Sequence, residues 1–175
     1  MSTYQIDPAH SAAHFSVRHM MIANVRGEFT KVSGTFSYDP QNPSSSTIEA
    51  TIDVASLHTN DPDRDQHLKS GDFFDADKFP QITFRSKSVT PEDGELFVRG
   101  DLTIHGVTHE VKLTVEGPTP ETKDPWGNLR VGATATGKIN RKDFGLAWNV
   151  ALEAGGVLVG EEVKLSLDVQ GIKQA

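Results

Sequence analysis

Three histidines near the start of the chain, His10, His14 and His19, are the residues whose chemistry stands out first. Imidazole is the commonest metal ligand in proteins and titrates close to neutral pH. If residues 13–19 form a strand, His14 and His19 point to opposite faces, because successive side chains of a strand alternate. No second group of Asp or His residues has the spacing of metal ligands. The sequence therefore predicts no metal site.

His19 has a further interpretation, because it shares one strand face with Phe15 and Val17. On an inward face it is either a hydrogen-bonded core histidine, which we favour, or a contact for the polar head of a ligand. It is also the one inward-facing acid or base that we can name for a catalytic mechanism.

The sequence patterns of common catalytic and phosphate-binding sites are absent. The chain has no cysteine, which excludes disulfides, thiolate metal sites and cysteine nucleophiles. It contains no Gly-x-Ser-x-Gly elbow, no glycine-rich phosphate loop and no His-Glu-x-x-His pair. Its carboxylates fall mainly on polar faces and in loops, which is typical of a solvated surface. We therefore expect a protein that is not an enzyme.

Two arginines and their neighbours are the remaining polar candidates. Arg64, Asp65 and His67 lie in a segment with helical signals, and Asn140 and Arg141 lie in a later connection. We favour a structural role for them, as a helix cap and as salt bridges that close one end of the fold. The alternative is that an arginine binds an anionic or carbonyl head group, to which the planar fork of guanidinium donors is well suited.

The composition is that of an ordinary globular domain. The chain has 175 residues, of which 36% are hydrophobic and 23% charged, so we expect one domain over residues 1–175. The net charge of -7 disfavours nucleic acid as a partner, and it disfavours binding to an anionic membrane by charge alone. No apolar run approaches the roughly 18 residues of a spanning helix, so we expect no stable membrane insertion.

The first residues, Met1 to Asp7, have neither the basic nor the apolar region of a signal peptide. The sequence as it stands predicts a cytoplasmic protein. A periplasmic protein from which a leader has been trimmed would look the same.

Alternation of apolar and polar residues dominates the chain and predicts strands. The first three expected strands cover about residues 13–19, 24–38 and 47–54. Five more are marked by apolar residues on one face: Ile82 and Phe84; Leu96, Val98, Leu102 and Ile104; Val111, Leu113 and Val115; Leu129, Val131, Ala133 and Ile139; Val163, Leu165, Leu167 and Val169. The apolar phase changes near Lys31, which predicts a β-bulge. Residues 91–94 and 105–108 predict tight hairpins.

One segment between the third and fourth strands has helical signals. Asn60 or Asp61 can cap a helix and Pro62 suits its first turn, so we expect a short helix over about residues 62–70. The loop that follows, residues 72–80, contains three phenylalanines among charged residues. We expect these aromatic rings to cover one mouth of the fold.

Eight strands and one short helix predict an all-β fold, a closed eight-stranded antiparallel barrel with the aromatic loop at its mouth. An open sheet would need a second layer that one helix cannot supply, whereas a closed barrel covers its own apolar face. At eight strands the interior is either filled by side chains or holds one small ligand. The candidate lumen residues are Phe15, Val17, His19, Phe36, Ile52, Val54, Phe73, Phe74, Phe84, Leu102, Val111, Leu113, Leu146 and Trp148.

Several blocks of sequence, in order between about Tyr4 and Gly171, carry a family resemblance. The blocks are 7–11, 15–19, 25–29, 64–75, 100–108 and 139–146. Together they resemble the YceI-like family of lipid-binding proteins, which are lipocalin-like barrels. The resemblance implies an extended apolar cavity that holds an isoprenoid chain, such as a polyprenyl pyrophosphate or a ubiquinone-type molecule. It implies no other cofactor, and it favours a cavity over a filled core.

The leading hypothesis is a non-catalytic protein that binds, transports or stores an isoprenoid lipid or quinone. Two alternatives remain. One is a barrel enzyme that acts on a hydrophobic substrate, and the other is a stress-related module with a filled core and no ligand. A homodimer is also open.

Overall fold

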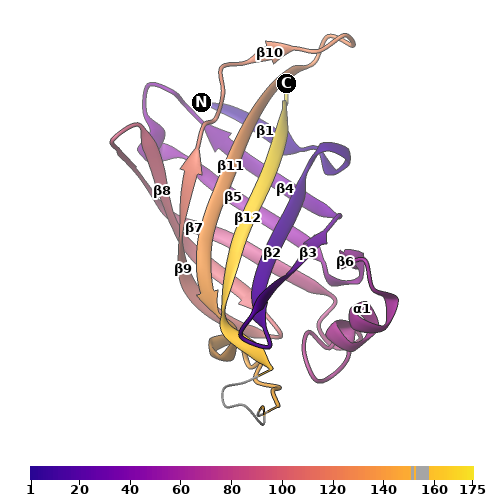
Figure 1. Cartoon of the computed structure of the whole chain (residues 1–175). Helices are drawn as coiled ribbons and strands as arrows, with labels where there is room; N and C mark the ends of the chain where they lie inside the picture. Colours follow the sequence, from indigo (N-terminus) through magenta and orange to yellow (C-terminus); the bar gives the residue numbers. More distant parts are fainter. Residues whose placement is uncertain (151, 153–157) are drawn as a thin grey trace.

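The chain forms long, bent strands that wind into a barrel (Figure 1). The computed structural model describes residues 1–150, 152 and 158–175. The strands are β1 (Ser2–Ile6), β2 (Ala12–His19), β3 (Ala23–Phe29), β4 (Val32–Tyr38), β5 (Thr47–Asp53), β6 (Leu57–His58), β7 (Gln81–Glu92), β8 (Glu95–Ile104), β9 (Val107–Glu116), β10 (Thr122–Lys123), β11 (Leu129–Asn140) and β12 (Val159–Lys173). The helical elements of the described chain are α1 (Pro62–Lys69) and the short 3-10 helices η1 (Pro8–His10), η2 (Pro43–Ser45), η3 (Val54–Ser56) and η4 (Arg141–Phe144).

Antiparallel pairing in chain order closes the barrel. β1 and β2 act as one bent strand, and β3 and β4 as a second, because β2 pairs with β3 and β1 pairs with β4. The ladder then runs through β5, β7, β8, β9, β11 and β12. β12 pairs with β2 over most of its length and with β1 near its end. The predicted closed eight-stranded antiparallel barrel is therefore confirmed.

The phase change near Lys31 is a break in the strand rather than a bulge within it. Residues 30 and 31 leave the ladder between β3 and β4. The amide of Lys31 donates to Ser56 Oγ at 3.1 Å, and its carbonyl accepts from the Asp53 amide at 3.0 Å. A neighbouring turn thus satisfies the backbone that the ladder no longer pairs. β1 was not among the predicted strands, although it supplies part of the closure.

Two hairpins and the helix follow the sequence prediction closely. Asp93-Gly94 and His105-Gly106 have positive φ angles at both central positions, as a two-residue type I′ turn requires. The helix α1 ends one residue earlier than predicted, and Asp61 caps it by accepting from two amides of its first turn. The helix α1 has 8 residues and a polar sequence. No helix of the described chain is long and apolar enough to cross a membrane.

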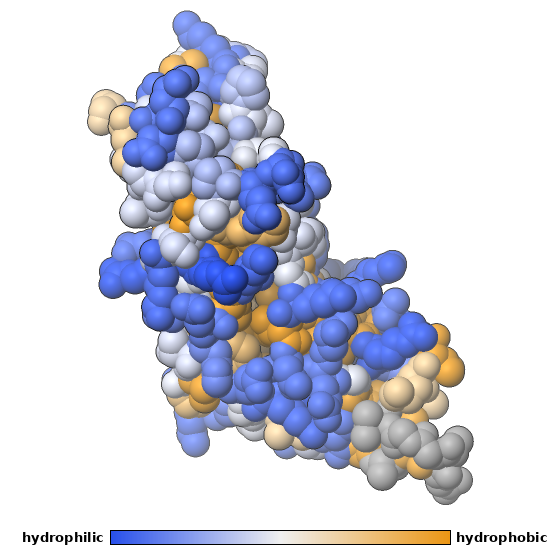
Figure 2. Space-filling view, turned by 90° about the vertical axis from the view of Figure 1, so that its left-hand side faces the viewer, coloured by the Kyte–Doolittle hydropathy of each residue, from blue (hydrophilic) through white to orange (hydrophobic). Residues whose placement is uncertain are grey.

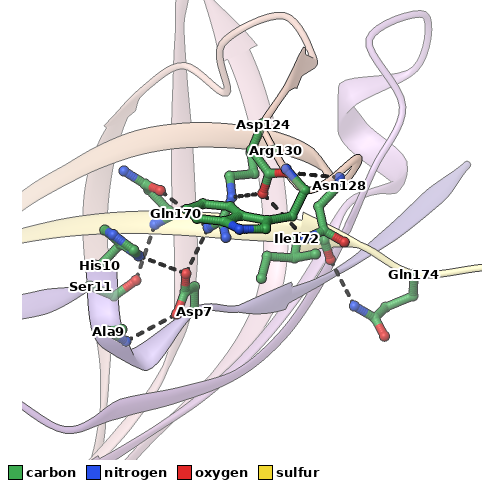
Figure 3. A network of polar contacts seen from close by, with 11 residues as sticks. Asp7, Ala9, His10, Ser11, Asp124, Asn128, Arg130, Gln170, Ile172 and Gln174 are labelled. Carbon is green, nitrogen blue, oxygen red and sulfur yellow. Dashed lines mark hydrogen bonds and ion pairs between the residues drawn. The ribbon is translucent and has the colours of Figure 1, made fainter.

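A polar network ties together the barrel end that carries the chain termini (Figure 3). Arg130 Nη1 donates to Asp7 Oδ2 at 2.6 Å, and Arg130 Nε donates to Asp124 Oδ2 at 2.7 Å. These bonds lower the pKa of both carboxyls, that of Asp124 from 3.8 to about 2. Because the pKa is lower in the folded state, the network stabilises fully above pH 3.8, and this contribution is lost as the pH falls towards 2.

Candidate binding cavity

The barrel interior is not completely filled by side chains. It contains an apolar cavity of about 350 Å³, lined from the strands around the barrel and from the segments at one mouth. This volume lies within the range of roughly 300–1,000 Å³ that is typical of small-molecule sites. The face drawn in Figure 2 carries mostly hydrophilic or neutral residues, with smaller apolar areas between them. The interior is therefore the place where an apolar ligand would be protected from water.

Thirteen of the fourteen predicted lumen residues line this cavity, and Val54 is the exception. Val54 is fully buried, but it begins η3 and so leaves the alternation of β5 that predicted its direction. Its side chain belongs to the solid part of the core. The residues that line the cavity as predicted are Phe15, Val17, His19, Phe36, Ile52, Phe73, Phe74, Phe84, Leu102, Val111, Leu113, Leu146 and Trp148.

Three of the lining phenylalanines each lie against a glycine of a nearby strand. The pairs are Phe15 with Gly27, Phe84 with Gly100, and Phe36 with Gly171. A Cβ atom added to any of these glycines would lie 2.4 to 2.5 Å from a ring carbon, which is closer than real contacts allow. The absent side chains leave room for each ring against the barrel wall. The glycines therefore keep the rings out of the lumen, a role that alternation did not indicate.

The described lining contains basic side chains but no carboxylate. The basic members are His19, Arg64, His67 and Arg141; His14 also borders the cavity, but its imidazole faces Glu28 and Asp168 on the outer wall. This composition contrasts with the net charge of -7 for the whole chain, because the carboxylates of the described residues lie outside the lumen. The lining would consequently accept an apolar molecule whose polar end is neutral or negative, and it would disfavour a cation.

Four side chains from separate parts of the sequence meet at the mouth beside α1. His67 packs edge-on against Trp148 and Phe73, with ring centroids 4.8 and 5.2 Å apart. Phe73 also lies 5.4 Å from Trp148, and the guanidinium of Arg141 lies 6.0 Å from the Phe73 ring. The sequence marked each of these residues separately but gave no signal that pairs them.

Arg141 is buried, with only 3% of its surface exposed, and it holds the segment after η4 in place. Its guanidinium donates to the backbone carbonyls of Leu146, Trp148, Val159 and Gly160. None of its hydrogen bonds in the described chain goes to a carboxylate, and burial lowers its pKa. The structural role that we favoured from sequence is present, but it uses carbonyl groups rather than salt bridges.

The Arg64 group is also held by uncharged acceptors. Arg64 Nε donates to Thr59 Oγ1 at 2.8 Å, and Arg64 Nη2 donates to the Thr59 carbonyl at 2.5 Å. Asp65 accepts from the amide and the hydroxyl of the same threonine and does not line the cavity. Asn140 does not line it either, because its side chain caps η4 by accepting from the Lys142 amide. Of the polar mouth candidates, the cavity therefore includes Arg64, His67 and Arg141.

Two of the three rings in the aromatic loop line the cavity. Phe73 is 6% exposed, and both Phe73 and Phe74 line the cavity. Phe74 packs edge-on against Phe29 at 5.5 Å. Phe79 instead lies on the β8–β9 hairpin, with its ring 4.8 Å from His105 and in the space where Gly106 would carry a side chain. Phe79 therefore does not line the cavity, and its ring packs on this hairpin instead.

No group of three or more His, Asp or Glu side chains within the described ranges could hold a metal ion. His14 faces Glu28 and Asp168 on the barrel wall, at 3.7 and 3.6 Å, and these contacts are partly exposed. His10 bonds to Asp7 at the other end of the barrel. The histidines near the start of the chain are thus separated by the fold.

Comparison with known proteins assigns the chain to a family. The model of the YceI-like domain matches residues 4–171. A UPF0312 protein of Staphylococcus aureus strain N315 is 39% identical over 170 residues, which is 97% of either chain. The protein YceI of Salmonella newport is 39% identical over 173 residues, covering 98% of this chain and 87% of its own.

Solved structures show the same barrel. BcnA of Burkholderia cenocepacia superposes with a TM-score of 0.78 at 25% identity, over 94% of this chain and 98% of its own. A polyisoprenoid-binding domain from Saccharophagus degradans superposes with a TM-score of 0.69 over 98% of both chains, and its identity of 15% supports the fold alone. The match over nearly the whole chain and the identities to curated relatives show that this protein belongs to the YceI-like family.

Proposed function

We propose that this protein binds an isoprenoid lipid, either a polyprenyl chain or a ubiquinone-like molecule, inside the barrel and stores or transports it without changing it chemically. The observation that carries the proposal is the lumen itself, an apolar cavity without a carboxylate among its described lining residues. A domain of the same fold from Saccharophagus degradans binds polyisoprenoids, which makes an isoprenoid the first cargo to test for this chain.

Apolar contact alone is sufficient to hold such a tail. One isoprene unit has five carbons, so at about 0.8 kcal/mol for each buried carbon it gains roughly 4 kcal/mol. Loss of translational and internal freedom on binding offsets a large part of this gain. Several buried units would still bind firmly without any polar contact in the lumen.

The position of the titratable groups favours binding over catalysis. The basic lining residues come from β2, α1 and η4, while the inward faces of β5, β8 and β9 carry apolar side chains along the lumen. A general acid or base must reach the reacting atom within about 3 Å. A tail along these strands would meet no such group, so a reaction would be confined to the polar head.

Tryptophan fluorescence tests the proposal, because the chain has two tryptophans in different places. Trp148 lines the cavity mouth, whereas Trp126 is 79% exposed in the β10–β11 connection. A Trp126→Phe variant leaves Trp148 as the reporter, and we expect a ubiquinone to quench its emission saturably. The matched Trp148→Phe variant should show much less quenching at the same quinone concentration. Equal quenching of both variants, or no saturation, would refute binding in the barrel.

A further inference from the structure

The exposed hydrophobic side chains gather at one end of the barrel. Six large hydrophobic residues of the described chain are strongly exposed, and four of them lie in two adjoining loops. Met20, Met21 and Ile22 form the tip of the β2–β3 hairpin, with 46%, 51% and 77% of their surface exposed, and Val150 is 47% exposed. Figure 2 shows apolar surface at this lower end of the molecule. A soluble monomer rarely leaves such a group uncovered.

Backbone hydrogen bonds join these loops into one surface. The Met20 amide donates to the Leu158 carbonyl at 2.7 Å, and the Leu158 amide donates to the Val150 carbonyl at 2.8 Å. Leu158 also lines the cavity, as do His19 directly before the hairpin tip and Trp148 before Val150. The apolar tip therefore continues into the mouth of the cavity.

The hairpin keeps methionines where the backbone favours other residues. Met20 and Met21 have φ angles of 53° and 60°, and the Ile22 amide donates to the His19 carbonyl. A type I′ turn of this kind is normally made by Asn-Gly, because these residues adopt positive φ with little strain. Two methionines at these positions make the turn less stable than Asn-Gly would, and they expose two flexible apolar side chains to water.

Cations lie directly behind the tip on the outer wall. Arg26 and Lys164 both pair across Ser16, and the Arg18 side chain lies beside Gly160. In the described chain none of Arg18, Arg26 and Lys164 has a carboxylate within 4.0 Å. The nearby Glu161 and Glu162 are paired with lysines at 2.8 and 3.9 Å. The local charge behind the tip is thus positive although the whole chain is acidic.

We propose that the hairpin tip (Met20, Met21 and Ile22) and Val150 form a docking surface for an anionic lipid bilayer, which sets the cavity mouth against the membrane. Apolar side chains that enter the acyl boundary, with cations at the level of the head groups, are the pattern of peripheral membrane binding. The role of this docking surface rests on the proposed function, because an isoprenoid carrier must exchange its cargo with a membrane. Its physical basis is independent of the cargo.

Vesicle binding of the full chain tests the surface. The probe is phosphatidylcholine vesicles with a minority of phosphatidylglycerol, compared with pure phosphatidylcholine in a flotation assay. The test variant combines Met20→Asn, Met21→Gly and Ile22→Ser, which removes the apolar side chains and supplies better turn residues, so the hairpin should still form. The matched control is Trp126→Ser, which removes an equally exposed apolar side chain at the far end of the barrel.

We expect the wild type and the Trp126→Ser control to float with the anionic vesicles and to be released by added salt. The hairpin variant should bind at least about tenfold more weakly, because it loses three apolar contacts with the acyl region. Absence of wild-type binding, or equal binding of the hairpin variant, would overturn the proposal. Light scattering tests the alternative that a second copy of the chain covers the tip. A dimeric wild type and a monomeric hairpin variant would show this and would overturn the proposal.

Extraction of lipid from the same preparations separates this proposal from the proposed function. A hairpin variant that keeps its isoprenoid but no longer floats supports both. A wild type that floats without any isoprenoid supports the docking surface and refutes the cargo. A wild type that carries isoprenoid but does not float refutes the docking surface alone.

Discussion

Introducing a carboxyl group at Leu113 tests whether the inward face of β9 holds the cargo. Leu113 is 9% exposed and lies in a core cluster with Val89, Leu96 and Val98. Its side chain packs closely over Gly137 of the neighbouring strand, where it would be 2.7 Å from an added Cβ. No basic lining residue comes from β8, β9 or β11, so a carboxylate in Leu113→Glu would find no cation on the surrounding strands.

The substitution lowers the free energy of unfolding through two contributions. Loss of the leucine burial removes about 1.5–3 kcal/mol, and burial of an uncharged carboxyl group without a partner costs about 1–3 kcal/mol. The sum of roughly 2.5–6 kcal/mol is a large part of the roughly 5–15 kcal/mol that is usual for a domain. An ionised carboxylate would cost more, so the introduced group would stay protonated or draw water into the lumen. Either outcome displaces an apolar tail.

The assay is extraction and mass spectrometry of lipid from the purified variant. Thr114→Glu is the matched control, because Thr114 is the next residue of β9 and its side chain points to the other face of the sheet. The control adds the same charge outside the barrel and should keep its cargo. Leu113→Met should keep both cargo and stability. A folded Leu113→Glu protein with as much lipid as Thr114→Glu would refute the placement of the tail.

Four further results are expected. Phe74→Ala should speed lipid release more than it lowers the melting temperature, and residues 70–79 should exchange amide hydrogens faster without lipid than with it; equally slow exchange would place the entrance elsewhere. Gly27→Ala should weaken lipid binding in a titration, because the new methyl group pushes the Phe15 ring into the lumen; unchanged affinity would contradict this. Arg130→Met should lower the melting temperature at pH 7, and this difference should shrink as the pH falls below 3.8 towards 2; a constant difference would refute the carboxylate network. Chelation should leave the melting temperature and lipid content unchanged, whereas a large drop would reveal a metal.

Alternation predicted the barrel well because the strands are long, and each has one face towards solvent and one face towards the barrel interior. The inward positions Phe15 and Val17 on β2, and Val111 and Leu113 on β9, follow from a period of two. The prediction failed where the period ends. Val54 follows the last paired residue of β5 and turns with η3, and a slip of one residue is enough to change its direction.

The mouth could be predicted only in part, because its contacts join segments far apart in the sequence. The sequence marked His67, Phe73, Arg141 and Trp148, but their meeting depends on the path of the chain after η4. Phe79 carried the same aromatic signal as Phe73 and lies on a hairpin instead. Composition does not distinguish the two, since any apolar neighbour satisfies an aromatic ring.

Native mass spectrometry of freshly purified protein shows whether the barrel carries an isoprenoid. We expect a population of chains that carry one additional molecule of several hundred daltons, which dissociates on activation and fragments as an isoprenoid. The Leu113→Glu variant should lack this population, and Thr114→Glu should retain it. A wild-type chain of bare mass that also fails to take up a polyprenyl phosphate or a ubiquinone in the same measurement would show that the barrel does not bind an isoprenoid.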